Sequence, residues 1–315
     1  MNYPYANGTI AAIEEKILDK NKLSKLLQKQ PQEVIKSLAD LGYGEKHTNN
    51  LEGLINQELK KTKELIEDIA PETKYSDLFF VASDNLNIKS LYKMKIFELY
   101  REDILVDSGV IPLDSLKKAI LENDFSDLDK SQVTLFKEIN GQIEGKRNPR
   151  VISAIIDNCV FKYLFLRLKK HPNAALKTYY QTFVDFANVK TFIRSLNLKW
   201  TVDEFLEMFI DGGKLPQALF VEIYDKSVDN ILKAFNNDYE GEITKGLKKY
   251  FDTHDLNSLE RYLDQLMLNI MKEFRFDSFS IGPMIYYYLK KQAEAKNIRY
   301  IYANPYLNAS MLLEY

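Results

Sequence analysis

A chain of 315 residues, 45% of them hydrophobic, is long enough to bury one large core or two to three smaller ones. Its 43 Lys and Arg residues nearly balance 45 Asp and Glu residues, so a net charge of −2 leaves no basic excess for binding nucleic acid. The only cysteine, Cys159, excludes a disulfide framework and a thiolate metal site, which fits a reducing cytoplasmic compartment.

We expect neither a secretion signal nor a membrane span. The first five residues lack the basic and apolar regions of a signal peptide. The apolar stretch 151–168 is interrupted by Asp157, Lys162 and Arg167, which disfavours a transmembrane helix. Scarce Gly (12) and Pro (9) are instead typical of a helix-rich protein.

The first long helix is predicted from Leu51 to Ile69. Apolar residues recur on one face at helical spacing, and the helix stops before Pro71. Gly53 lies near its beginning, where it weakens the helical pattern. Runs of alternating apolar and polar residues are too short to indicate paired strands, so we predict an all-α fold.

Two further long helices follow. Asn148 and Pro149 form an N-cap and a first helical position, and His171 with the following proline ends that second helix. The third carries apolar residues from 259 to 274, and Asn257 with Glu260 is predicted to form the capping box at its start.

A short pattern of asparagine, aliphatic residue and basic residue occurs three times, at intervals of 101 and 109 residues. Each copy lies late in an aromatic-rich segment that follows one of the long helices, so the order of elements repeats as well. We therefore predict three similar helical units, at 1–105, 106–209 and 210–315. The copies of the pattern are Asn87-Ile88-Lys89, Asn188-Val189-Lys190 and Asn297-Ile298-Arg299.

Two turns of the form Asp-x-Gly-x-aliphatic-Pro close the first two units, at 107–112 and 211–216. Their glycine would permit a left-handed turn that ends one helix, and their proline suits the first turn of the next. Because loops held between rigid helices often carry contacts, we predict that these turns face protein partners. The candidate contacts are Asp107, Gly109, Pro112, Leu113, Asp211, Gly213, Leu215 and Pro216.

No pattern for catalysis or metal binding is found. Residues 211–215 lack the earlier glycine and the Ser or Thr of a phosphate-binding loop. His47, His171 and His254 lie in separate predicted loops without metal-ligand spacing, and the acidic cluster at 124–129 lacks the order of a calcium loop. We expect no active site, no cofactor and no metal.

The opening Tyr5-Ala6-Asn7, the later Glu14 and Leu18, the Gly109-x-Ile111-Pro112 turn and the threefold pattern together carry a family resemblance. Over its full length the chain resembles the C subunit of archaeal and bacterial V-type ATPases, the counterpart of the eukaryotic V-ATPase d subunit. One departure is that Gly8, Thr9 and Ala11 stand where the family's first helix is usually rich in arginine. The tail at 304–310 has no counterpart in the other two units.

The resemblance implies a funnel of three units around a pseudo-threefold axis, on the cytoplasmic end of the membrane rotor ring. Such a non-catalytic, peripheral subunit would contact the ring proteolipids and the central-shaft subunits and would transmit torque for ion transport. The ion, proton or sodium, and the direction, ATP synthesis or hydrolysis, are set by other subunits.

Two alternatives belong to other classes. A helical-repeat adaptor that binds soluble proteins should show repeats of roughly 35 to 45 residues, whereas the period here is about a hundred. An all-helical enzyme would need a buried polar constellation.

For Lys89, Lys190 and Arg299 we expect surface cations near carboxylates rather than binding residues.

Overall fold

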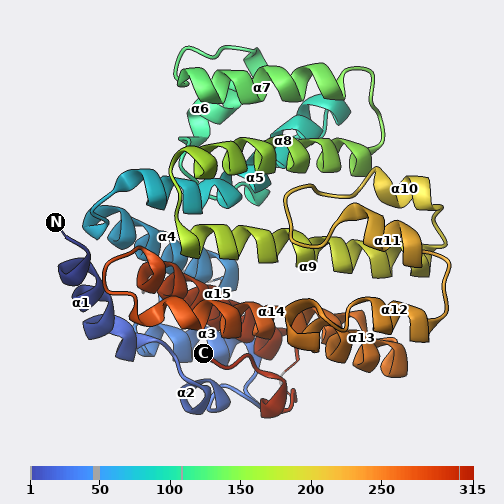
Figure 1. Ribbon diagram of the computed structural model, residues 1–315. Helices are drawn as coiled ribbons and strands as arrows, with labels where there is room; N and C mark the ends of the chain where they lie inside the picture. The colour runs from blue at the N-terminus through green and yellow to red at the C-terminus, as the bar shows by residue number, and fades with distance from the viewer. Residues whose placement is uncertain (1, 45–49, 108, 305) are drawn as a thin grey trace. The chain divides into compact units, whose positions relative to one another are not determined.

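A computed structural model describes residues 2–44, 50–107, 109–304 and 306–315. Every regular element in these ranges is a helix, so the predicted all-α fold is confirmed (Figure 1). Residue contacts divide the chain into two compact units, which are described separately. The terminal unit holds both ends of the sequence, Met1–Ser76 and Asp264–Tyr315, and the central unit is Asp77–Leu263. The three units at 1–105, 106–209 and 210–315 and their funnel stay predictions.

The terminal unit is built from both ends of the sequence. Its helices are α1 (Tyr3–Ile13), η1 (Glu14–Lys16), α2 (Lys20–Ser24), α3 (Pro31–Asp40), α4 (Leu51–Ile69), η5 (Lys272–Phe276), α15 (Gly282–Ala303) and η6 (Ala309–Met311). Two longer helices, α5 (Thr73–Phe97) and α14 (Leu256–Met271), contain the unit boundaries. His47 and Pro305 lie outside the described residues.

The core of the terminal unit joins sequence-distant helices. Leu54 and Ile55 of α4 are fully buried in one cluster with Ile298 and Ile301 of α15 and with Leu38 of α3. As predicted, α4 ends before Pro71, and the Asn50 side chain caps its start by accepting from the Gly53 amide. The N-terminal segment and the C-terminal helix therefore share one hydrophobic core.

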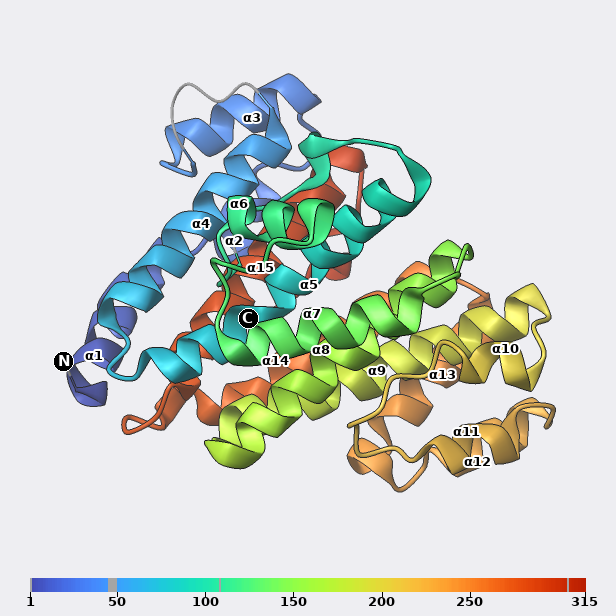
Figure 2. The ribbon, with the colours of Figure 1, turned by 90° about the horizontal axis from the view of Figure 1, so that it is seen from above.

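The central unit contains shorter helices around three long ones. They are η2 (Glu102–Ile104), α6 (Leu113–Lys117), the π-helical η3 (Lys118–Glu122), α7 (Lys130–Ile143), α8 (Pro149–Lys170), α9 (Ala174–Leu198), α10 (Val202–Leu206), α11 (Gln217–Ile223), α12 (Val228–Ala234), η4 (Asp238–Gly241) and α13 (Glu242–Thr253). Figure 1 shows α7, α8 and α9 as successive layers, and Figure 2 shows α11 beside α12.

Aromatic side chains fill much of the core of the central unit. Phe192, Phe205 and Phe220 are fully buried and lie with ring centroids 5.7 to 5.8 Å apart. Tilted and edge-to-face arrangements of this kind suit the ring quadrupoles. Many of the chain's 18 Phe and 20 Tyr residues thus serve packing in this region.

Helix boundaries match the sequence predictions with one exception. The second long helix is α8, which begins at Pro149 after the N-cap Asn148 and ends at Lys170. The predicted capping box of Asn257 and Glu260 is wrong, because α14 already begins at Leu256. The Asp255 carboxylate accepts from the Asn257 amide instead.

Candidate partner interface

The asparagine of the threefold pattern makes the same contact in each copy, which we call the amide clamp. Its side-chain oxygen accepts from the backbone N–H of a later residue, and its side-chain nitrogen donates to the carbonyl of that residue. The Nδ2 to O distances are 2.7, 2.8 and 3.0 Å, and the N to Oδ1 distances are 2.9, 2.9 and 2.8 Å. The pairs are Asn87 with Val106, Asn188 with Ile210, and Asn297 with Leu313.

An acidic residue three positions before each asparagine makes a second contact, which we call the carboxylate clamp. Asp84 and Asp185 each accept two consecutive backbone amides from the turn that follows the amide clamp, and the distances are 2.9 to 3.1 Å. The amides belong to Val110, Ile111, Lys214 and Leu215. These acids were not among the predicted site residues, although their fixed spacing from the asparagine is a readable signal in the sequence.

The turn glycines are needed for a different reason from the one predicted. A Cβ on Gly109 or on Gly213 would lie 2.0 Å from a carboxylate oxygen of Asp84 or Asp185. Neither glycine has the left-handed backbone that the sequence analysis expected, whereas Gly212 does, with φ of 106°. The clamp therefore requires glycine because the carboxylate approaches the backbone closely.

The third carboxylate clamp binds the opposite end of the sequence. The Glu294 carboxylate accepts from the Leu18 amide at 2.5 Å, while Asn297 beside it holds Leu313. The Tyr315 hydroxyl donates to the Leu18 carbonyl at 2.7 Å. The C-terminal tail, for which the sequence showed no counterpart, thus supplies at Leu313 the partner that Val106 and Ile210 supply in the other copies.

A buried charge cluster surrounds Glu294 in the terminal unit. The Lys291 ammonium contacts Glu294 and lies 2.8 Å from Oε1 of Glu58, and its side chain is only 3% exposed. Burial raises the pKa of Glu294. The equivalent Asp185 also has a raised pKa because of burial, even though Tyr239 and two backbone amides donate to it.

In two copies of the threefold pattern, the basic residue pairs with a carboxylate, as expected. Lys89 pairs with Asp157 of α8 at 2.8 Å, and Arg299 makes a bidentate pair with Glu52 of α4 at 2.7 and 2.9 Å. Lys190 lines a groove of the central unit. Both of the described pairs join the helix of the pattern to a long helix of the same compact unit.

The two predicted partner-facing turns offer both exposed and buried residues. Asp107, Pro112, Asp211 and Pro216 are exposed, and each proline directly precedes a helix, α6 or α11. Gly109, Leu113 and Gly213 are partly buried. Leu215 is 2% exposed, so in this structure it belongs to the core and is not presented to a partner. Ser108, within the first turn, lies outside the described residues.

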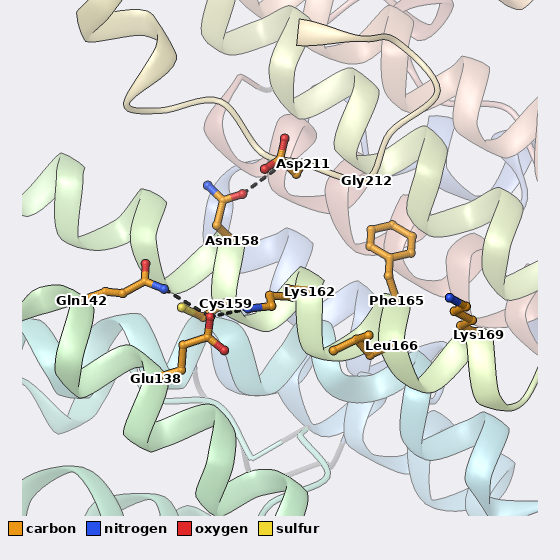
Figure 3. Close-up of a pocket in the computed structure, with 10 residues that line it drawn as sticks. All are labelled: Glu138, Gln142, Asn158, Cys159, Lys162, Phe165, Leu166, Lys169, Asp211 and Gly212. Carbon is orange, nitrogen blue, oxygen red and sulfur yellow. Dashed lines mark hydrogen bonds and ion pairs between the residues drawn. The ribbon is translucent and has the colours of Figure 1, made fainter.

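A pocket of about 540 Å³ adjoins the second turn (Figure 3). Asn158 of α8 accepts from the Asp211 amide at 3.0 Å and donates to the Phe209 carbonyl at 2.8 Å. The lining residues are Glu138, Gln142, Asn158, Cys159, Lys162, Phe165, Leu166, Lys169, Asp211 and Gly212. Leu166 is 60% exposed, so the turn and the pocket together form a mixed polar and apolar surface.

Two titratable side chains of this pocket are either protonated or paired with a neighbour. Burial raises the pKa of Cys159 to about 11, so the thiol is not ionised near neutral pH. Glu138 is engaged by the Lys162 ammonium at 2.7 Å and by the Gln142 amide at 3.2 Å. Within the described ranges, no three His, Cys, Asp or Glu residues are grouped to hold a metal ion.

None of the helices in the part of the chain that the structure describes is both long and apolar enough to span a membrane.

Comparison with known proteins matches nearly the whole chain to one family. The family described as ATP synthase (C/AC39) subunit matches residues 6–304. The C subunit of the A-type ATP synthase of Thermococcus kodakarensis is 24% identical over 94% of this chain and 85% of its own length. The corresponding C subunits from Methanosphaera stadtmanae and Methanosarcina barkeri are both 23% identical, over 95% and 96% of this chain and 83% and 88% of their own lengths. This chain therefore belongs to the ATP synthase (C/AC39) subunit family.

Proposed function

We propose that this protein is a non-catalytic central-stalk subunit of a V-type rotary ATPase. In this role it joins the soluble shaft subunits to the proteolipid ring at the cytoplasmic face of the membrane and transmits torque for ion transport. The match to the ATP synthase (C/AC39) subunit family over residues 6–304 carries the proposal. The relatives, which are C subunits of A-type ATP synthases, support membership of such a complex.

The clamps supply the stiffness that torque transmission needs. Each turn of the central unit is fixed by four hydrogen bonds from one helix, α5 or α9, two from an asparagine and two from a carboxylate. These hydrogen bonds are buried or partly buried, and they resist deformation because breaking one leaves a polar group without its partner. A force that a partner applies at Asp107 or Asp211 would therefore be transmitted directly to a long helix.

Co-purification from membranes tests the proposal. The tagged chain, extracted with detergent, should retain ring proteolipids and shaft subunits. Charge reversal at both exposed turns, Asp107→Arg with Asp211→Arg, should lower the recovery of at least one of these partners about tenfold if the turns are contacts. Asp252→Arg, on the exposed face of α13, is the matched control and should leave recovery unchanged.

The outcomes separate the two levels of the proposal. Recovery of unrelated soluble proteins in place of ring and shaft subunits would favour a helical-repeat adaptor. Retention of all partners by the charge-reversed chain would remove the turns from the interface but keep the stalk role. Circular dichroism of each variant establishes that the fold is intact.

A further inference from the structure

A second hollow of the central unit, about 740 Å³ in volume, shares no lining residue with the pocket of Figure 3. It runs between the first half of α8 and the second half of α9, and Lys93 of α5 and residues 208 and 210 complete it. We call it the Trp200 groove, because the chain's only tryptophan forms part of its wall. None of the predicted contact residues lines it.

Positive charge predominates in this groove. Lys93, Arg150, Lys190 and Arg194 line it, and Asp157 is the one carboxylate among its described lining residues. Asp157 already accepts from Lys89 at 2.8 Å and from Asn85 at 2.7 Å. Arg194 pairs with Glu260, which lies outside the lining. A ligand carboxylate would therefore meet a net positive surface.

The positive charge of Lys93 is destabilised by its surroundings in the groove. Burial lowers its pKa, and repulsion from Lys89 lowers it further, although Asp157 opposes the change. An added negative charge beside Lys93 would relieve both unfavourable contributions, since it would compensate the lost hydration and balance the neighbouring cation.

The groove also offers apolar surface. The Arg150 guanidinium lies 4.7 Å from the centroid of the Trp200 ring, an arrangement typical of a cation over an aromatic face. Leu198 is 60% exposed at the groove, and Met208 and Ile210 add further apolar side chains. A small anion such as phosphate would leave this apolar surface unused.

We propose that the Trp200 groove binds an acidic peptide segment of a partner protein, with carboxylates on Lys93 and Arg150 and an apolar side chain against Trp200 and Leu198. Charge complementarity selects an acidic peptide, because such a peptide combines negative charge with apolar side chains along one chain. The inference deepens the proposed function by giving the chemistry of one partner segment, and it rests on that function only in naming the partner a subunit of the same complex.

A peptide assay on the isolated full-length chain tests the groove. The probe is a short fluorescently labelled peptide of alternating Glu and Leu, with a Gln and Leu peptide as the neutral control. We expect the acidic peptide to bind, to change the Trp200 emission and to bind more weakly when NaCl is raised to about 0.5 M. Lys93→Glu with Arg150→Glu should weaken binding at least about tenfold, measured by anisotropy.

Matched controls decide between the outcomes. Lys248→Glu with Lys249→Glu reverses two exposed cations on α13, outside the groove, and should leave binding unchanged. Equal binding of the neutral peptide, or equal loss with the α13 variant, would overturn the proposal. So would ATP or anionic phospholipid vesicles that bind through Lys93 and Arg150 when the peptide does not. If only the peptide assay fails while ring and shaft subunits still co-purify, the stalk role stands without the groove.

Discussion

The two compact units use the same clamps but connect them differently. In the central unit, Asp84 and Asp185 hold amides only 26 to 30 residues further along the chain. In the terminal unit, Glu294 holds Leu18, which is 276 residues away. Closing the first kind of contact orders a short loop, whereas the second requires both ends of the sequence to meet. An acidic residue three positions before the clamp asparagine can therefore stabilise either a local turn, through two amides, or the closure of a whole unit, through one.

Removing the C-terminal segment should destabilise the protein more than any other change proposed here, and it should act on the terminal unit. Deletion of residues 312–315 removes two leucines that are each 4% exposed, together with the partner of the Asn297 clamp. We expect the free energy of unfolding to fall by about 4 kcal/mol, measured by urea denaturation. Hydrogen exchange should show lost protection at Leu18 but not at Ile111 or Leu215.

The control for this deletion is Tyr306→Ala. Tyr306 is 81% exposed, so its removal should change stability by less than about 0.5 kcal/mol. Equal loss of protection in both units after the deletion would contradict the separate closure of the terminal unit.

A methyl group at the second turn should have a smaller effect, confined to the central unit. In Gly213→Ala the new Cβ would meet Asp185 Oδ1 and force the carboxylate away from the Lys214 and Leu215 amides. We expect a loss of about 3 kcal/mol, measured by thermal or urea unfolding.

Gly141→Ala is the matched substitution at an open position. Gly141 lies in α7, and nothing lies within 4 Å of an added Cβ. Alanine there should stabilise the protein by up to about 1 kcal/mol, because it is the better helix former. If both alanine variants changed the stability in the same direction, the close approach of Asp185 would not explain why residue 213 is glycine.

The pH dependence of stability should be the smallest effect. Because burial raises the pKa of Glu294, the folded protein holds this proton more tightly than the unfolded chain. Its favourable contribution is therefore complete in acid and is lost as pH rises through the folded pKa. Relative to Glu294→Gln, the wild-type protein should lose stability as the pH rises above the ordinary pKa of a glutamate side chain, as measured by denaturation at a series of pH values.

Asp185→Asn provides the comparison in the central unit. Burial raises this pKa too, so the difference from wild type should change with pH in the same direction. An opposite slope for Glu294 alone would mean that the Lys291 ammonium, rather than burial, controls its ionisation.

Local signals in the sequence predicted much of the fold. The N-cap at Asn148 and the stop before Pro71 gave helix ends correctly, because caps and prolines act through adjacent backbone. The asparagines of the threefold pattern were also found, and all three make the same contact. The acids three residues earlier could have been read with them, but a Glu in the third copy replaces the Asp of the other two.

The remaining features depend on contacts that no local pattern contains. Asn257 looked like a cap, yet Asp255 takes that role two residues earlier. Leu215 lies in an exposed turn, but its amide is held by Asp185, and its side chain is directed into the core. The pairing of Leu18 with Glu294 joins segments 276 residues apart, which spacing alone cannot reveal. Long-range closure was therefore the part that sequence reasoning missed.

The contact between Leu18 and Glu294 has a consequence for synthesis on the ribosome. The central unit holds all the residues of its clamps between 84 and 215, so it can begin to fold while later residues are still being added. The terminal unit must wait until α15 and then Leu313 have emerged, and before α15 is made the apolar side chains of α3 and α4 lack their partners on it. During translation, the early helices thus expose apolar side chains to water for most of the time that the chain is being made.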